Sequence, residues 1–112
     1  MIYTVTLNPA LDYYCTVESL KLGETNRCIR EALIGGGKGI NVSLMLAQLK
    51  VPTTALGFAA GFTGEELIRQ VQAQAITADF IRCEQGQTRI NAKINSGVET
   101  EINGRGPEVS TA

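Results

Sequence analysis

The sequence contains no histidine and no tryptophan, and only 5% of its residues are aromatic. Without histidine, Ser-His-Asp and Cys-His catalysis and most zinc sites are excluded. The scarcity of aromatic side chains argues against a surface that stacks nucleic-acid bases. A net charge of −1 gives no general footprint for nucleic acid or acidic membranes. We therefore expect neither nucleic acid nor a membrane surface as a partner.

Long apolar runs are also missing, and no stretch approaches the length that crosses a bilayer. Met1 leads directly into a strand-like segment, so we expect no signal peptide and a cytoplasmic protein. The cysteines, Cys15, Cys28 and Cys83, are odd in number and lack C-x-x-C spacing. They predict buried or incidental thiols in a reducing compartment rather than a disulfide framework. A chain of 112 residues allows one domain at most.

The most distinctive stretch is residues 35–43, which read GGGKGINVS. Glycines let the backbone approach a ligand, and a helix start offers unpaired N–H groups with partial positive charge. Together with Lys38, these groups predict a cradle for an anion or a polyol. A glycine-rich loop that enters a buried helix would explain the glycines alone better. Lys38 and Asn41 favour the binding site, because neither is needed to build a turn or a core.

Two nucleotide-binding motifs fail at this stretch. A Walker A loop needs Gly-Lys followed by Ser or Thr, whereas Gly39 follows Lys38 and Ala32 occupies the place of the upstream glycine. A dinucleotide fingerprint needs G-x-G-x-x-G directly after a strand, and the spacing of Gly35, Gly37 and Gly39 is different. We therefore expect a small phosphorylated or hydroxylated ligand here instead of a nucleotide.

The apolar pattern predicts alternating strands and helices. Strands are expected over residues 2–7, 53–58 and 79–81, and helices over residues 39–49 and 63–75. This order predicts a parallel sheet. Thr63 and Glu66 have the spacing of a capping box that opens the second helix. This helix carries Leu67, Ile68 and Val71 on one apolar stripe. Apolar residues surround the first helix almost completely, so we expect both of its sides to be covered.

A second group of strands is predicted over residues 13–17, 26–33, 88–95 and 98–103. Strict alternation places Ile90, Ala92 and Ile94 on one face of an antiparallel hairpin. That face needs a cover, either the sheet of the same domain or a partner chain. Asp12 follows the first strand, where it either binds a ligand or caps a turn.

Six stretches of the chain resemble, in the same order, those of one known family: MIYTVTLNPALDY, Asn26-Arg27, GGGKGINVS, ALGFAAGFTGEE, TRINAKI and TEINGRGP. The chain resembles the N-terminal part of PfkB-family (ribokinase-like) carbohydrate kinases. Within the family it is most similar to bacterial members that phosphorylate fructose 1-phosphate, and members that phosphorylate tagatose 6-phosphate share most of these motifs.

The resemblance implies an α/β fold of the Rossmann-like ribokinase type, with a parallel sheet, flanking helices and a small antiparallel β lid. The core would comprise residues 1–12, 34–87 and 104–112, and the lid residues 13–33 and 88–103. In this family the lid often clasps a second lid, which implies a homodimer. The family's pattern also implies substrate-binding roles for the following residues: Asp12 toward the sugar hydroxyls, Gly36, Gly37 and Asn41 in the pocket wall, Lys38 and Arg89 on the substrate's phosphate, Asn103 in closure over the sugar, and Arg27 in its own or a partner's pocket.

The reaction implied is ATP-dependent phosphorylation of D-fructose 1-phosphate to fructose 1,6-bisphosphate, with Mg²⁺ on the nucleotide phosphates. The family's catalytic aspartate lies in a G-A-G-D motif that this sequence does not contain. The anion hole and the ATP pocket belong to the same missing half. We therefore assign no catalytic or metal-binding residue in this chain and expect it to be inactive alone. The alternative is a non-catalytic module that senses a sugar phosphate or dimerises through the lid.

Overall fold

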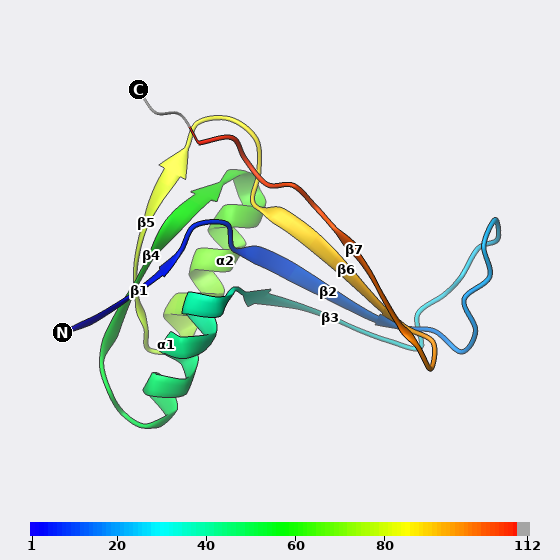
Figure 1. Ribbon diagram of the computed structural model, residues 1–112, viewed down its shortest axis with the longest axis horizontal. Helices are drawn as coiled ribbons and strands as arrows, with labels where there is room; N and C mark the ends of the chain where they lie inside the picture. The colour runs from blue at the N-terminus through cyan, green and yellow to red at the C-terminus, as the bar shows by residue number, and fades with distance from the viewer. Residues whose placement is uncertain (110–112) are drawn as a thin grey trace.

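The computed structural model describes residues 1–109, which form a mixed α/β structure (Figure 1). A parallel sheet with the helices against it occupies one end of the molecule, and a longer sheet extends away from it. The elements are β1 (Ile2–Thr6), β2 (Ala10–Thr16), β3 (Arg30–Gly36), α1 (Lys38–Gln48), β4 (Thr53–Ala60), α2 (Gly61–Ala73), β5 (Thr77–Cys83), β6 (Arg89–Asn95) and β7 (Glu99–Asn103). This is the α/β architecture with an added β lid that the sequence predicted.

The parallel sheet, which we call the core sheet, has the strand order β1-β4-β5. Ile2 of β1 lies opposite Thr53 of β4, and β4 also pairs in parallel with β5. Both connections from strand to parallel strand contain a helix. The predicted order of strands and helices is therefore confirmed, although β5 is longer than the predicted residues 79–81.

Both helices pack against the same face of the core sheet. Alternation along β4 directs Ala55 and Ala59 toward them, and these small side chains let the helices approach closely. The other principal members of the buried cluster are Ile40 of α1, Phe80 of β5, and Leu67, Ile68 and Val71 of α2. The apolar stripe predicted for the second helix is thereby confirmed.

The opposite face of the core sheet and the outer side of α1 are left uncovered by the described residues. The exposed apolar side chains are Tyr3, Val5 and Ile81 on the sheet and Val42, Met45 and Leu49 on the helix. The prediction that both sides of the first helix are covered is wrong for this structure, because only the side with Ile40 and Ser43 meets the sheet. Apolar surfaces of this kind normally contact another part of a protein.

The second sheet, which we call the lid sheet, has the order β3-β2-β6-β7. β2 pairs antiparallel with β3 and parallel with β6, and β6 and β7 form the predicted antiparallel hairpin. β3 spans Arg30–Gly36 instead of residues 26–33, so Gly35 and Gly36 belong to a strand. β2 begins at Ala10, which places Asp12 inside a strand and makes the turn interpretation of this residue wrong.

The start of α2 differs from its prediction. The helix begins at Gly61, and Ala60 occupies the N-cap position without a side-chain hydrogen bond. The Thr63 hydroxyl donates instead to the carbonyl oxygen of Thr88, at 2.8 Å. Glu66 binds side chains further along the same helix. The predicted capping box is therefore wrong, because the partner of Thr63 is Thr88, which directly precedes β6 and lies far from Thr63 in the sequence.

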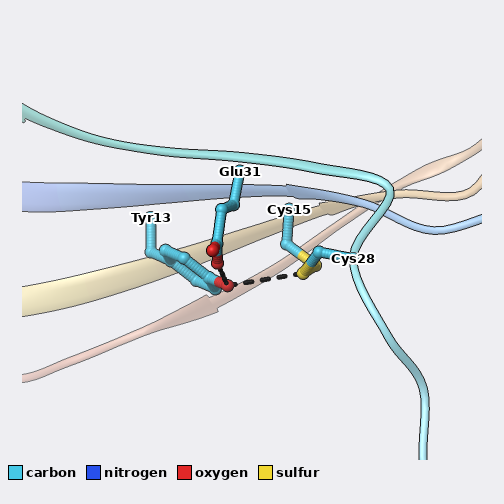
Figure 2. Close-up of a disulfide and its surroundings, with 4 residues drawn as sticks. All are labelled: Tyr13, Cys15, Cys28 and Glu31. Carbon is cyan, nitrogen blue, oxygen red and sulfur yellow. Dashed lines mark hydrogen bonds between the residues drawn. A yellow bond between two sulfur atoms is a disulfide. The ribbon is translucent and has the colours of Figure 1, made fainter.

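The cysteine prediction is also wrong, because Cys15 and Cys28 form a disulfide (Figure 2). Cys15 lies in β2 and Cys28 in the segment that precedes β3. These segments run side by side, and the Ile29 N–H donates to the Thr16 carbonyl at 2.7 Å. This pairing brings the two Cα atoms to 5.5 Å, a separation that a disulfide spans readily. The odd number of cysteines and their spacing in the sequence gave no indication of this disulfide.

The Tyr13 hydroxyl lies beside this disulfide (Figure 2). It donates a hydrogen bond to the Glu31 carboxylate and lies 3.3 Å from the sulfur of Cys28. The hydrogen bond to Glu31 raises the pKa of Tyr13, since removing the phenolic proton would place two negative charges together. The disulfide and this pair join β2 to the start of β3 at the end of the lid sheet away from the helices.

We expect oxidised, denatured protein to present only the Cys83 thiol to a thiol reagent, and all the cysteines after reduction. We also expect Cys28→Ser to lower the free energy of unfolding of the oxidised protein by about 2–3 kcal/mol, as for closure of a short loop. Urea unfolding without reductant measures this effect, and Cys83→Ser serves as the matched control. Equal stability of the Cys28→Ser and Cys83→Ser proteins would contradict the prediction.

Candidate functional site

One row of paired residues crosses the lid sheet at Asp12. Asp12 of β2 lies opposite Asn91 of β6, which lies opposite Asn103 of β7. The Asn91 amide donates to Oδ1 of Asp12 at 3.3 Å, and its Oδ1 accepts the Gly104 N–H at 3.1 Å. Asn91 is buried, so it holds the Asp12 carboxylate and the end of β7 in a fixed relation. The other carboxylate oxygen of Asp12 is available for a hydroxyl donor.

A second row lies two residues away along the strands. Ala10 of β2 pairs with Gly36 of β3 on one side and with Arg89 of β6 on the other. Paired residues share a face of a sheet, and so do residues two apart along a strand. Gly36 and Arg89 therefore lie on the same face as Asp12 and Asn103. Cross-strand pairing thus brings four of the predicted site residues together.

The absence of a side chain at Gly36 keeps this face open. A Cβ atom there would lie 3.1 Å from Oδ2 of Asp12 and 4.0 Å from Oδ1 of Asn41. These two oxygen atoms therefore border the same small space from different elements, β2 and α1. A carboxylate and an amide that face one space suit a ligand with several hydroxyl groups.

Arg89 carries a buried nitrogen without a partner. Its Nε atom has no hydrogen-bond partner among the described residues. A buried guanidinium N–H that stays unpaired is unfavourable, so such an atom points to a missing acceptor. Arginine donors match the oxygens of a phosphate group well. The orphan nitrogen therefore fits an anionic group at the same face as Asp12.

Lys38 is the first residue of α1 and is exposed. Within residues 1–109, its amine takes part in no ion pair. It follows Gly36 by two residues, and the partial positive charge of the helix start adds to its own charge. Neither Lys38 nor Arg89 takes part in an ion pair among the described residues.

The remaining glycines of the loop have a packing role. A Cβ atom at Gly37 would lie 2.5 Å from Cγ2 of Thr6, and one at Gly39 would lie 2.5 Å from Oγ1 of the same residue. That Oγ1 accepts the N–H of Ile40 at 3.0 Å, so this helix-start N–H is not free for a ligand. Glycines are required here because the end of β1 passes directly beneath the helix start.

Arg27 is not brought to this face within the chain. It lies in the exposed loop before β3, next to Cys28 and at the far end of the lid sheet (Figure 1). Its role in a pocket stays a prediction that needs a partner subunit.

Two residues of β6 escaped the sequence reasoning. Asn91 donates to the Asp12 carboxylate. On the same face, Nζ of Lys93 lies 3.1 Å from Oε1 of Glu101 and above the ring of Tyr14. The hydrogen bond to Glu101 and then the charge of Asp12 raise the pKa of Lys93. The signal was present, because strict alternation along this strand sets Asn91 and Lys93 on the face of Arg89.

A nucleotide and its metal do not fit the described residues. No group of three or more His, Cys, Asp or Glu side chains within residues 1–109 is placed to hold a metal ion. The glycine loop packs on Thr6 and lacks the spacing of a Walker loop. In the described part of the chain, neither helix is long and apolar enough to cross a membrane. The site as built offers a carboxylate, an amide and a buried guanidinium N–H to a small polar ligand.

The protein is an α/β protein with two sheets. Helices cover one face of the parallel core sheet, and the lid sheet carries the polar candidate site on one of its faces. The chain belongs to the pfkB family of carbohydrate kinases, whose family model matches residues 5–112. Its fold is the ribokinase-like fold of that family.

Three relatives illustrate the similarity. The chain is 47% identical to the 1-phosphofructokinase of Bacillus subtilis, over 98% of this chain and 36% of that protein. It is 41% identical to the D-tagatose-1-phosphate kinase of Bacillus licheniformis, over 100% of this chain and 36% of that protein. The crystal structure of phosphofructokinase-2 from Escherichia coli in complex with substrates and products matches with a TM-score of 0.84 and 30% identity, over 94% of this chain and 35% of that one. The chain therefore spans little more than a third of the length of these relatives.

Proposed function

We propose that this chain is the sugar-phosphate-binding part of an ATP-dependent kinase that converts D-fructose 1-phosphate to fructose 1,6-bisphosphate. The observation that carries the proposal is the buried Nε of Arg89, which has no hydrogen-bond partner within residues 1–109 and lies on the same face as the Asp12 carboxylate. This pair matches a ligand with an anionic end and a hydroxylated end. The 47% identity to a 1-phosphofructokinase supports the choice of sugar.

The chain's residues would bind and orient the acceptor. Asp12, anchored by Asn91, would accept hydrogen bonds from sugar hydroxyls, and Gly36, Gly37 and Asn41 would border the sugar. Arg89 and Lys38 would bind the phosphate already present on the substrate. Asn103 would close over the sugar from β7, and Arg27 would act in the pocket of a partner subunit. The chain would thus fix the acceptor hydroxyl in line for transfer.

ATP and Mg²⁺ would supply the phosphoryl group and neutralise its charge. Since the described residues do not fit them, we place their site, with the catalytic base, in the two thirds of the relatives' length that this chain does not span. This chain then contributes no proton transfer of its own. Its residues hold the substrate and help the lid to exclude water from it.

The proposal can be tested with a hybrid that we call the reconstituted kinase, which joins this chain to the remaining two thirds of the Bacillus subtilis 1-phosphofructokinase. A second version uses the remainder of the Bacillus licheniformis D-tagatose-1-phosphate kinase. We expect both versions to show a higher kcat/KM for fructose 1-phosphate than for tagatose 1-phosphate or tagatose 6-phosphate. A selectivity that changes with the host would contradict the assignment, as would inactivity of both versions.

Tagatose phosphate is the second candidate substrate, because the D-tagatose-1-phosphate kinase matches this whole chain at 41% identity. A preference of both versions for a tagatose phosphate would establish it. A chain that binds fructose 1-phosphate but supports no turnover in either version would indicate the non-catalytic sensing module instead.

Asn91 allows a further prediction about this site. Asn91→Leu removes the donor to Asp12 and one of the two acceptors of the Gly104 N–H, which also donates to the Ile90 carbonyl at 3.2 Å. We expect the variant to bind fructose 1-phosphate more weakly by about 1–3 kcal/mol. The KM of the reconstituted kinase for the sugar measures this loss, and Asn95→Leu, on the same strand and face, is the control. An unchanged KM would show that Asp12 needs no anchor.

We further propose that the intact protein is a homodimer that joins through the lid. Ile90 of β6 and Ile102 of β7 are exposed on the lid face opposite the site. Replacing Ile90 and Ile94 by Asp is expected to convert dimers of the reconstituted kinase to monomers in sedimentation velocity, because buried charges would oppose the contact. Lys21→Asp, in the exposed loop, is the control. A variant that stays dimeric would place the interface elsewhere.

A further inference from the structure

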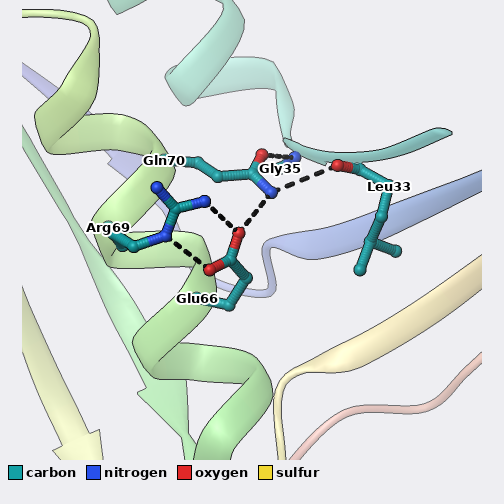
Figure 3. A network of polar contacts seen from close by, with 5 residues as sticks. All are labelled: Leu33, Gly35, Glu66, Arg69 and Gln70. Carbon is teal, nitrogen blue, oxygen red and sulfur yellow. Dashed lines mark hydrogen bonds and ion pairs between the residues drawn. The ribbon is translucent and has the colours of Figure 1, made fainter.

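The side chain of Gln70 joins α2 to the free edge of the lid sheet (Figure 3). Its Oε1 accepts the Gly35 N–H at 2.6 Å, and its Nε2 donates to the Leu33 carbonyl at 3.1 Å. β3 is the outermost strand of the lid sheet, so these main-chain groups have no neighbouring strand to pair with. The amide of Gln70 offers them one acceptor and one donor, as a peptide group of a further strand would. It thus takes the place of a missing strand at two successive outward-facing residues.

The orientation of this amide is fixed by a charged neighbour. Nε2 of Gln70 also donates to Oε2 of Glu66 at 2.8 Å, and Arg69 holds the same carboxylate with contacts of 2.6 and 2.7 Å (Figure 3). The hydrogen bonds from Arg69 and then Gln70 lower the pKa of Glu66 to about 2. A flipped amide would turn its oxygen toward the Glu66 carboxylate and the Leu33 carbonyl, and its NH₂ toward the Gly35 N–H. Only the observed orientation pairs all of these groups.

The position of Gln70 ties this contact to the site. Gly35 directly precedes Gly36, and α1 begins at Lys38. A Cβ atom at Gly35 would lie 2.8 Å from Cδ1 of Leu67, so α2 presses closely against the strand at this point. Close packing leaves the strand little freedom toward the helix, and the Gln70 amide sets its position along the edge. The position of β3 beside the Asp12 carboxylate is therefore fixed by its contacts with α2.

We propose that Gln70 is a positioning residue for the sugar-phosphate site. Gln70 holds Gly35 and thereby fixes the segment 36–38 that follows. The position of this segment sets the distance between the Lys38 amine and the Asp12 carboxylate. The inference rests on the proposed function for its substrate. Its structural part, the restraint on Gly35, is independent of that function.

The test uses the reconstituted kinase with Gln70→Met, which keeps the side chain's length and removes its hydrogen bonds. Gln70→Glu is the second variant, because it keeps an acceptor for Gly35 but repels Glu66. Gln72→Met, exposed on the same helix, is the matched control. We expect both Gln70 variants to raise the KM for fructose 1-phosphate about tenfold while the KM for ATP stays at the control's value. Hydrogen exchange at the Gly35 amide should accelerate in Gln70→Met, which lacks the acceptor, and in Gln70→Glu, because repulsion by Glu66 displaces the acceptor.

The outcomes separate the two proposals. Wild-type turnover with Gln70 variants that match the Gln72→Met control in sugar KM overturns the positioning role and leaves the proposed function standing. Equal losses in both KM values reduce Gln70 to a general stabilising residue and also overturn it, as does unchanged exchange at Gly35. Inactive wild-type hybrids count against the proposed function, while the exchange measurement still decides whether Gln70 restrains the strand. If Gln70→Met fails to fold, Gln70→Glu decides by the same criteria.

Discussion

Arg89→Ala in the reconstituted kinase is expected to raise the KM for fructose 1-phosphate by about 10- to 150-fold, which corresponds to the loss of about 1.5–3 kcal/mol for one charge-assisted contact. The physical reason is the buried Nε of Arg89, which has no acceptor among the described residues. A phosphate oxygen would satisfy it only in the complex, so the whole interaction is lost on truncation. Lys38→Ala is expected to act in the same direction with a smaller effect, because the exposed amine is better solvated.

Steady-state kinetics with both substrates varied measures these effects. Arg30→Ala and Lys50→Ala are matched controls, since each removes the same type of charge from an exposed position away from the site. Higher ionic strength should reduce the difference in sugar KM between variant and wild type more for Lys38→Ala than for Arg89→Ala. Salt screens an exposed charge more effectively than a buried one. A large loss in ATP affinity with an unchanged sugar KM would show that these cations belong to the other substrate.

The chain of 112 residues, tested alone, is expected to show no turnover of ATP with fructose 1-phosphate and Mg²⁺. Phosphoryl transfer needs two substrates held in line, a metal-bound nucleotide and stabilisation of spreading negative charge. The described residues supply groups for the acceptor only, and no cluster among them is placed to hold a metal ion. The difference from the reconstituted kinase is therefore the largest that we predict.

The assay should use protein free of host kinases, with the reconstituted kinase as the positive control. The chain should also associate or aggregate on its own, because apolar side chains of the core sheet and α1, such as Val5, Met45 and Ile81, are exposed. Weak binding of fructose 1-phosphate that disappears in Arg89→Ala would be consistent with the proposal. Turnover that survives purification and is lost in Lys38→Ala would contradict it and reveal a base within the chain.

Several elements could be predicted from local patterns because their physical causes are local. Strict alternation over residues 88–95 and a second strand expected over residues 98–103 predicted the β6–β7 hairpin. The stripe of Leu67, Ile68 and Val71 predicted the buried side of α2. The capping-box prediction failed because the Thr63 hydroxyl binds a residue distant in the sequence instead of accepting a main-chain N–H of its own helix start. Thr63 donates to Thr88, and no pattern within one turn of a helix contains that information.

The candidate site divides in the same way. Lys38 and Asn41 could be predicted as ligand-binding residues because a cation and an amide among glycines have few structural uses. Asp12 was indicated only by its place after the first strand, where a turn was an equal alternative, and Arg89 only by the family resemblance. The glycines themselves were ambiguous: Gly37 and Gly39 pack on Thr6, and the place of Gly37 in the pocket wall stays a prediction. Asn91 was overlooked because its importance depends on lying opposite Asp12, far away in the sequence.

The sequence by itself determined the kind of protein: an α/β chain of the pfkB family whose strand and helix order follows from apolar periodicity. Its motifs also predict which residues bind the ligand. Only the tertiary structure decided which of these residues share one face, that Cys15 pairs with Cys28, and that Gln70 completes the edge of β3. The reason is physical. Periodicity reports the environment of each residue, whereas pairing across strands is set by register between distant segments, and register exists only once the chain has folded.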